Sequence, residues 1–240
     1  MILLRLGRTV LDFSYLERNI SEIRERMEAA RRAADRKDDI SLVVAAKSGS
    51  AEEINYLHKH CGVNDIGENR VQQLLEHYEQ LDLEGLNIHF IGHLQTNKVK
   101  YIIDKVCMIH SVDSERLAAE IDKQAAKHGL VMKVLVEVNS GEEPNKDGVM
   151  PKDAAALCEA IAKYPHLSLA GLMTMAPICE KKEDYKKYFE KISRLAVDIW
   201  SKNSDNKERP ILSMGMSGSF EEAIVSGATA VRVGRKLFEK

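Results

Sequence analysis

The chain has 240 residues, of which 44% are hydrophobic and 30% are charged, enough to bury one large α/β domain or two small ones. Its 35 basic and 37 acidic residues leave a net charge of −2, which argues against a nucleic-acid-binding surface. No apolar run approaches the roughly 20 residues of a membrane span, and four widely spaced cysteines without a secretory leader favour the cytoplasm.

A long amphipathic helix is expected first, because apolar residues recur between Phe13 and Ala30 at three- and four-residue steps. Short apolar segments then alternate with stretches of helical periodicity. The expected strands are 42–46, 64–66, 88–91, 107–110, 131–138, 168–173, 211–214 and 230–233. The expected helices between them are 51–60, 69–80, 96–105, 114–128, 151–163, 183–203 and 219–226.

These elements form about eight β/α units, and no Gly-, Ser- or Pro-rich linker divides them. The pattern predicts an α/β protein, a single (β/α)8 TIM barrel over residues 1–240 with an extra N-terminal helix. A doubly wound open sheet is the alternative architecture. Its first strand would lead into a G-x-G-x-x-G turn, whereas residues 45–54 read AAKSGSAEEI, so closure into a barrel is favoured.

Polar, glycine-bearing segments follow nearly every expected strand. They are Lys47, GEN (67–69), GHLQTNK (92–98), SVDS (111–114), NSGEEPNKDG (139–148), MTMAP (173–177), MGMSGS (214–219) and RVGR (232–235). Because the loops at the carboxyl ends of the strands build the active site of a TIM barrel, we expect these segments to surround one mouth. Met214 and the other methionines in these segments are expected to pack around the rim and to be available to a ligand.

Two of these segments fit a phosphate site. In SMGMSGSFEEAI (213–224), Ser219 and Glu222 have the capping-box spacing, and free backbone N–H groups beside Ser217 would suit an anion. Gly234 follows the last strand, where a missing side chain lets the backbone approach a ligand. The alternative is that these glycines only make tight turns. Both loops follow strands seven and eight, where barrels commonly bind phosphate, and this favours the anion site.

Arg232 is unusual because it lies inside the apolar strand AVRV. Strand alternation places Val231 and Val233 on the opposite face, so Arg232 is expected to point into the barrel. A buried guanidinium must either be paired or serve a ligand. A structural ion pair with an inward carboxylate such as Glu137 is the alternative to a ligand contact.

Lys47 closes the buried strand LVVAA (42–46). A lysine at a strand end can simply extend into solvent. Its expected neighbours, an arginine and a phosphate site, favour a different role: a partly desolvated amine near another cation has a lowered pKa and forms Schiff bases with aldehydes. A natural ligand that carries both an aldehyde and a phosphate is pyridoxal 5′-phosphate (PLP).

Seven segments together form a specific signature: VVAAK (43–47), GENRVQ (67–72), HFIGHLQTNK (89–98), VEVNSGEEPNKDGV (136–149), LAGLMTM (169–175), LSMGMSGSFEEAI (212–224) and GATAVRVG (227–234). With them the chain resembles the pyridoxal-phosphate homeostasis proteins, single barrels similar to the N-terminal domain of alanine racemase. The resemblance covers nearly the whole chain. It departs from the family after the lysine, where SGS (48–50) stands in place of a frequent Thr and a nearby Pro.

The resemblance implies a set of residues that bind the cofactor PLP. This set is Lys47, Asn69, Met214, Ser217, Arg232, Gly234 and Arg235. Lys47 would carry PLP as a Schiff base, and Ser217 with the backbone at Gly234 and Arg235 would hold its phosphate. Arg232 would meet the pyridine nitrogen, and Asn69 would line the surroundings of the ring. No metal is expected.

The expected function is that of a PLP-binding protein in vitamin B6 and amino-acid homeostasis, without robust catalysis. A cation about 4 Å from the pyridine nitrogen repels its proton by roughly 4 kcal/mol at an effective dielectric of about 20, which weakens the ring as an electron sink. Barrel racemases use a second acid/base from an additional domain, for which this chain, ending at Lys240, has no room. PLP-accepting apo-enzymes are the expected partners, and the expected state is a monomer or weak dimer.

Two enzymatic alternatives remain open on the sequence. An amino-acid racemase would need a second proton-transfer group, for which His93 or His110 could serve. A Schiff-base aldolase would need a carboxylate near Lys47, for which Glu68 or Glu137 could serve. Visible absorbance separates the aldolase from the PLP-binding alternatives, because PLP is yellow when bound.

Overall fold

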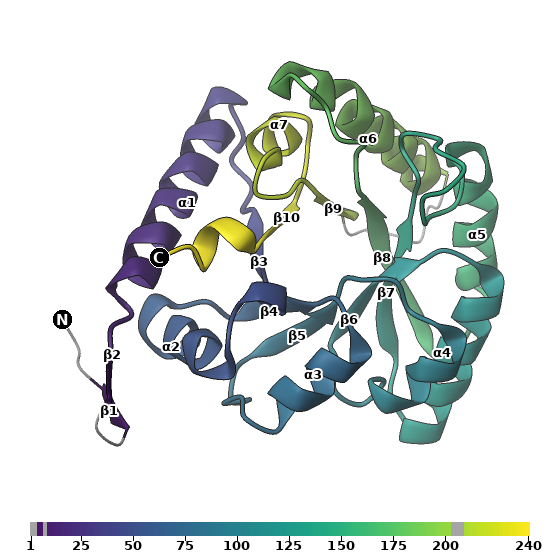
Figure 1. Ribbon diagram of the computed structural model, residues 1–240. Coiled ribbons are helices and arrows are strands. Elements are labelled where there is room, and N and C mark those ends of the chain that lie inside the picture. Colours follow the sequence, from purple (N-terminus) through teal and green to yellow (C-terminus); the bar gives the residue numbers. More distant parts are fainter. Residues whose placement is uncertain (1–3, 7–8, 203–208) are drawn as a thin grey trace.

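The computed structural model describes residues 4–6, 9–202 and 209–240, and Figure 1 shows a ring of strands surrounded by helices. Eight parallel strands form a closed barrel in the order β10-β3-β4-β5-β6-β7-β8-β9. The strands are β3 (Ser41–Ala45), β4 (Asp65–Glu68), β5 (Asn87–Phe90), β6 (Met108–Val112), β7 (Met132–Glu137), β8 (Leu167–Thr174), β9 (Ile211–Met214) and β10 (Ala230–Val233). The expected closed barrel is confirmed, and each strand lies within two residues of its expected bounds.

Helices connect the barrel strands on the outside. They are α1 (Ser14–Ala33), α2 (Ala51–Cys61), α3 (Val71–Tyr78), α4 (Glu115–His128), α5 (Ala154–Ile161), α6 (Tyr185–Ser201) and α7 (Phe220–Val225). Five short 3₁₀ helices accompany them: η1 (Ala46–Ser48), η2 (Thr96–Tyr101), η3 (Pro151–Asp153), η4 (Lys182–Asp184) and η5 (Arg235–Leu237). The final residue of the expected helix 183–203 lies outside the described residues.

The expected helix 96–105 is wrong in type. Residues 96–101 form the 3₁₀ helix η2, in which Lys98 N donates to Gln95 O, and turns follow it. This segment is rich in β-branched residues, which lose side-chain freedom against the preceding turn of a regular helix. A second difference is a two-stranded antiparallel sheet, β1 (Leu4–Leu6) and β2 (Thr9–Leu11), which the hydropathy pattern did not predict.

The extra N-terminal helix α1 completes the outer ring. Its buried face carries Leu16, Ile20, Ile23 and Met27, which confirms the expected apolar periodicity. Figure 1 shows α1 beside α7 and the short C-terminal turn η5, and it also contacts α2. In the described residues the 3₁₀ helix η5 follows β10, and α1 packs against it on the outside of the barrel.

Alternation along the strands separates two environments. Val44, Ile66 and Phe90 face the helices in the main hydrophobic cluster, where each buried side chain contributes about 1.5–3 kcal/mol. Their strand neighbours face the barrel interior, which holds only small apolar clusters such as Val43, Ala45 and Ile91. Much of the remaining interior is polar, and it includes the side chains of Arg232 and Glu137 that are described with the site below.

The start of α2 is fixed by a capping box that lies three residues after Lys47. Ser50 Oγ accepts from Glu53 N at 3.3 Å, and Ser50 N donates to Glu53 Oε2 at 2.7 Å. We predict that Ser50→Ala lowers the free energy of unfolding by about 1 kcal/mol, measured by chemical denaturation. Ser48→Ala, at an exposed position just before this cap, is the control and should leave stability unchanged. Equal losses in the two variants would contradict this prediction.

Candidate functional site at the carboxyl end of the barrel

Three adjacent strand ends bring the expected site segments together. β9, β10 and β3 are consecutive in the barrel, and the loops that follow them carry Ser217, Gly234 and Lys47 respectively. Arg232 N donates to Gly215 O at 3.1 Å, which ties the loop after β9 to β10. A Cβ atom built on Gly234 would lie 2.7 Å from Ala45 O, so the end of β10 packs closely on β3.

The side chain of Lys47 is exposed, which corrects the expectation of a partly desolvated amine. The backbone leaves β3 at Ala45 and turns through η1, where Gly49 N donates to Ala46 O at 3.0 Å. The turn takes Lys47 beyond the packed end of the strand, to the open mouth. A side chain at Gly49 would overlap the ring of Phe238, so the C-terminal segment packs against this turn.

The loop after β9 differs from its expected geometry. Ser219 has φ −146° and ψ 8°, and its Oγ accepts from Met216 N at 3.3 Å instead of capping α7. The expected capping box with Glu222 is therefore wrong, because an N-cap residue needs an extended backbone to reach the N–H groups of its helix. The N–H groups of Ser217 and Gly218 donate to no acceptor within the described residues. Gly218 faces open space.

Gly234 is required by the neighbouring strand. A Cβ there would lie 2.7 Å from Ala45 O and 2.9 Å from Ala45 Cβ, both closer than side chains tolerate. This contact supplies a packing reason for the glycine in addition to the expected approach of a ligand. The first hydrogen bond of η5 runs from Leu237 N to Gly234 O at 2.8 Å, so the N–H of Arg235 precedes the bonded part of that turn. The Arg235 side chain is exposed.

Arg232 points into the barrel, as expected, and is only 4% exposed. Its Nη1 donates to Ser213 O and Ser213 Oγ, both at 2.7 Å, and its Nη2 donates to Thr174 O at 3.0 Å. Burial lowers the pKa of Arg232 to about 10, and the charge of Glu137 opposes this effect. Within the described residues Arg232 bonds Ser213 and Thr174 and no carboxylate, so the alternative of a direct pair with Glu137 is not formed, although the two charges still influence each other. Its Nε–H has no acceptor in that part of the chain.

Glu137 ends β7 and faces the same interior, where it is 3% exposed. Burial raises the pKa of Glu137 to about 7; Arg232 opposes this rise, and the carboxylates of Asp147 and Asp113 add to it. The Glu137 side chain is therefore partly protonated near neutral pH.

The raised pKa of Glu137 predicts a pH-dependent stability. The folded protein binds the Glu137 proton more tightly than the unfolded chain does. The contribution of this proton to the free energy of unfolding is therefore complete below pH 4.5 and is lost as the pH rises through about 7. When the pH is raised from 5 to 8, the free energy of unfolding of wild type should fall by about 2–3 kcal/mol more than that of Glu137→Gln. Thermal unfolding at the two pH values tests this, with Glu159→Gln, an exposed site, as control. A constant difference between Glu137→Gln and wild type would refute the prediction.

Asn69 lies at the mouth beside β4. Its Oδ1 is buried and has no hydrogen-bond partner in the described chain, which is unusual for an amide oxygen. Asn69 also lines a cavity of about 720 Å³ together with His93 and Lys98. The preceding residue, Glu68, instead bonds His77 Nδ1 of α3 at 2.7 Å on the helix side of the sheet. Glu68 is therefore not available as an acid/base next to Lys47.

Met214 lies on the outer face of β9. It is fully buried in the cluster between strands and helices, whereas Ser213, its neighbour, bonds Arg232 in the interior. Alternation therefore turns the Met214 side chain away from the barrel mouth, and the expectation that it contacts a ligand is corrected.

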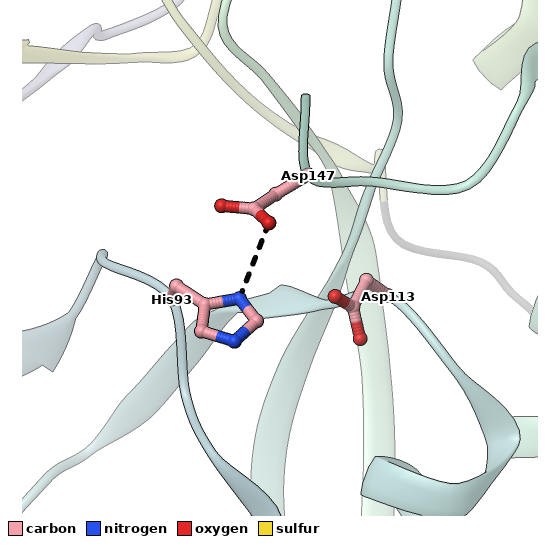
Figure 2. A group of neighbouring side chains, drawn as sticks. All are labelled: His93, Asp113 and Asp147. Carbon is pink, nitrogen blue, oxygen red and sulfur yellow. Dashed lines mark ion pairs between the residues drawn. The ribbon is translucent and has the colours of Figure 1, made fainter. Parts of the chain in front are cut away.

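Sequence reasoning missed a polar cluster that lies at the same carboxyl end of the barrel, after strands β5, β6 and β7. His93 after β5, Asp113 after β6 and Asp147 after β7 point toward one another (Figure 2), and His93 Nδ1 lies 3.4 Å from Asp147 Oδ1. The side chains of His93 and Asp147 are about half exposed. Both aspartates lie in segments expected at the mouth, but only the folded chain brings them together. Their negative charge contributes to the raised pKa of Glu137.

His110 does not lie at the mouth. It is 1% exposed inside the barrel, and its Nδ1 lies 3.0 Å from Ser213 Oγ. Burial and the nearby His89 and Arg232 lower the pKa of His110 well below its usual value. A proton-transfer role of His110 toward a substrate at the mouth is therefore wrong.

Comparisons with known proteins identify the family. The family model described as "Alanine racemase, N-terminal domain" matches residues 12–239. A pyridoxal phosphate homeostasis protein of Aquifex aeolicus is 42% identical over 219 residues, 91% of this chain and 95% of that protein. The chain therefore belongs to the alanine racemase N-terminal domain family and, within it, to the pyridoxal phosphate homeostasis proteins. The resemblance noted in the sequence is confirmed.

Solved structures agree with this assignment. PipY of Synechococcus elongatus, solved with PLP bound, has a TM-score of 0.81 and 28% identity; the match covers 93% of this chain and 100% of PipY. An alanine racemase of Clostridium difficile has a TM-score of 0.73 and 17% identity, covering 95% of this chain and 57% of that enzyme. The second likeness concerns the fold alone. Among the described residues, no helix combines the length and apolar character needed to cross a bilayer.

Proposed function

We propose that this protein binds PLP reversibly at the carboxyl end of the barrel and serves PLP homeostasis. The observation that carries the proposal is the adjacency of Lys47, the Ser217 loop and Gly234 on three consecutive strand ends. The pyridoxal phosphate homeostasis proteins to which the chain is related, and the PLP-bound PipY, support the choice of ligand.

The residues present fit this cofactor. The Ser217 hydroxyl and the free N–H groups of Ser217 and Gly218 suit a phosphate, and the N–H of Arg235 lies at the next strand end. Within the described part of the chain the buried Asn69 Oδ1 has no hydrogen-bond partner, as expected of a group that would bond a ligand. PLP supplies an aldehyde that an amine attacks with loss of water, in a reaction that hydrolysis reverses. Lys47 is the residue that provides this amine.

The surroundings favour storage and release over catalysis. Arg232 is held by Ser213 and Thr174. In the proposed site its guanidinium would face the pyridine nitrogen, and a cation there would disfavour protonation of that nitrogen. His110 is held inside the barrel and Glu68 bonds α3, so neither of these acid/base candidates faces a substrate at the mouth. His93 at the mouth and Glu137 in the interior are the candidates that an enzymatic alternative would use. An exposed Lys47 is open to water and to incoming amines, as transfer of PLP to apo-enzymes requires.

An absorption spectrum of the purified protein mixed with PLP tests the proposal. We expect a visible band that borohydride removes, and a reduced PLP adduct on the peptide that contains Lys47, identified by mass spectrometry. A protein that remains colourless, or an adduct spread over many lysines, would reject PLP binding at this site.

A further inference from the structure

Five polar side chains form one hydrogen-bonded chain inside the barrel. Arg232 Nη1 donates to Ser213 Oγ at 2.7 Å, and Ser213 Oγ lies 3.0 Å from His110 Nδ1. His110 Nε2 lies 3.0 Å from His89 Nδ1, and His89 Nε2 lies 3.0 Å from Asp65 Oδ1. The members come from β10, β9, β6, β5 and β4, so the chain crosses the interior from one wall to the other.

The two ends of this chain lie in different environments. Ser213, His110 and His89 are 0%, 1% and 8% exposed, so the middle is buried. Asp65 is the first residue of β4, and its side chain is 33% exposed. With His89 and His110 it lines a cavity of about 590 Å³ at the amino end of the barrel. The chain therefore joins the cavity at the amino end of the barrel to Arg232, which lies toward the proposed PLP site.

The donors and acceptors determine which way each bond runs. A guanidinium only donates and an ionised carboxylate only accepts, so His89 donates to Asp65 through Nε2. If both imidazoles are neutral, Ser213 donates to His110 and His110 donates to His89. Every bond then has one donor and one acceptor, and all of them point toward Asp65.

One additional proton on His89 reverses the middle of the chain. The cationic ring donates through Nδ1 to His110, whose hydrogen moves from Nε2 to Nδ1 so that it donates to Ser213. Ser213 Oγ then accepts from both His110 and Arg232, and its own hydroxyl hydrogen turns out of the chain. Burial lowers the pKa of His89, but the bond to Asp65 and the nearby Cys107 outweigh it and raise the pKa to about 9. The pKa of His110 is lowered well below its usual value, so the proton resides on His89.

We propose that Asp65, His89, His110 and Ser213 are positioning residues for Arg232, and that the proton on His89 sets how Ser213 holds the guanidinium. This inference rests on the proposed function, in which Arg232 faces the pyridine nitrogen. The affinity for PLP at the carboxyl end of the barrel then depends on whether His89, near the amino end, carries its second proton.

Other ionisable groups also face this chain and must be considered in any pH experiment. Cys107 lies next to His89, and Glu137 of β7 faces Arg232. The charged groups that share the amino-end cavity with Asp65 are Asp38, Asp39, Lys133 and Arg209. Because Glu137 titrates near neutral pH, each pH series is to be repeated in the Glu137→Gln background.

The first experiment uses the protein without PLP. Nitrogen NMR of the histidine rings reports their tautomers, and the guanidinium signals of Arg232 report its contact with Ser213. We expect the Arg232 signals to titrate with the midpoint of His89. Asp65→Asn should lower that midpoint by roughly one pH unit or more, because the neighbouring negative charge is removed. Asp39→Asn, in the same cavity but outside the chain, should not.

The second experiment measures PLP affinity by titrating the visible band. Ser213→Ala should weaken binding about tenfold, because Arg232 loses the hydroxyl acceptor. Ser213→Thr keeps a hydroxyl and should restore most of this loss, which a purely structural role of Ser213 would not predict. In wild type, a plot of PLP affinity against pH should show a step at the pH where His89 titrates. In Asp65→Asn this step should lie at lower pH.

Two results would overturn the inference. One is an Arg232 signal that ignores the His89 titration; the other is an Asp65→Asn variant that matches Asp39→Asn in both experiments. Absence of PLP binding by the wild-type protein would instead reject the proposed function. In that case the NMR titration still decides whether the chain couples His89 to Arg232.

Discussion

Lys47→Ala is expected to abolish both the visible band with PLP and the adduct that borohydride fixes. Lys47 is the lysine of η1, the turn that follows β3, and β3 is the strand next to β10, which ends before Gly234. Because the Lys47 side chain is exposed and makes no side-chain hydrogen bond within the described residues, its removal should change the free energy of unfolding by less than about 0.5 kcal/mol. Titration with PLP and chemical denaturation measure the two effects separately.

Lys181→Ala provides the matched control. Lys181 is also an exposed lysine, in the segment between β8 and η4. It should retain the full visible band and the adduct on Lys47. A Lys47→Ala protein that still yields one fixed adduct at the mouth would show that another lysine provides the amine.

Arg232→Ala is expected to cost about 3 kcal/mol of folding free energy and to weaken PLP binding strongly. The substitution leaves Ser213 O and Thr174 O without their guanidinium donor in a buried interior, removes one donor from Ser213 Oγ, and creates a cavity. Arg232→Lys retains a cation with fewer and less fixed donors, so its loss of stability should be smaller. Urea denaturation gives the stabilities, and PLP titration gives the affinities.

The two Arg232 variants together separate folding from binding. If Arg232→Lys is as stable as wild type and yet binds PLP more weakly, the planar guanidinium is needed at the ligand. If both variants bind PLP as wild type does, Arg232 has a structural role only, and its proposed position at the pyridine nitrogen is wrong.

The barrel was predictable because its strands and helices can be recognised from short stretches of sequence. Fully apolar segments such as 42–46 identify strands buried on both faces, and amphipathic stretches identify the helices that cover them. The inward direction of Arg232 was predictable for the same reason, since Val231 and Val233 define the opposite face. Met214 could have been assigned correctly by applying the same alternation to β9.

The details that were not predictable depend on backbone turns and on contacts between distant segments. Nothing in the local sequence shows that η1 takes Lys47 into solvent, or that Ser219 folds back onto Met216 instead of capping α7. The interior chain joins His89 and His110, which lie on different strands and were interpreted separately. Such pairs become visible only when the barrel closes.

Closure itself occurs at the proposed site. β3 is the first barrel strand in the chain and β10 is the last, and their pairing is the seam that completes the cylinder. A ligand held by Lys47 on one side and by the loops after β9 and β10 on the other would tie the two edges of this seam together. Its binding free energy would then oppose local opening of the cylinder, so amide hydrogen exchange along β3 and β10 should slow more than exchange along β6 on the far wall.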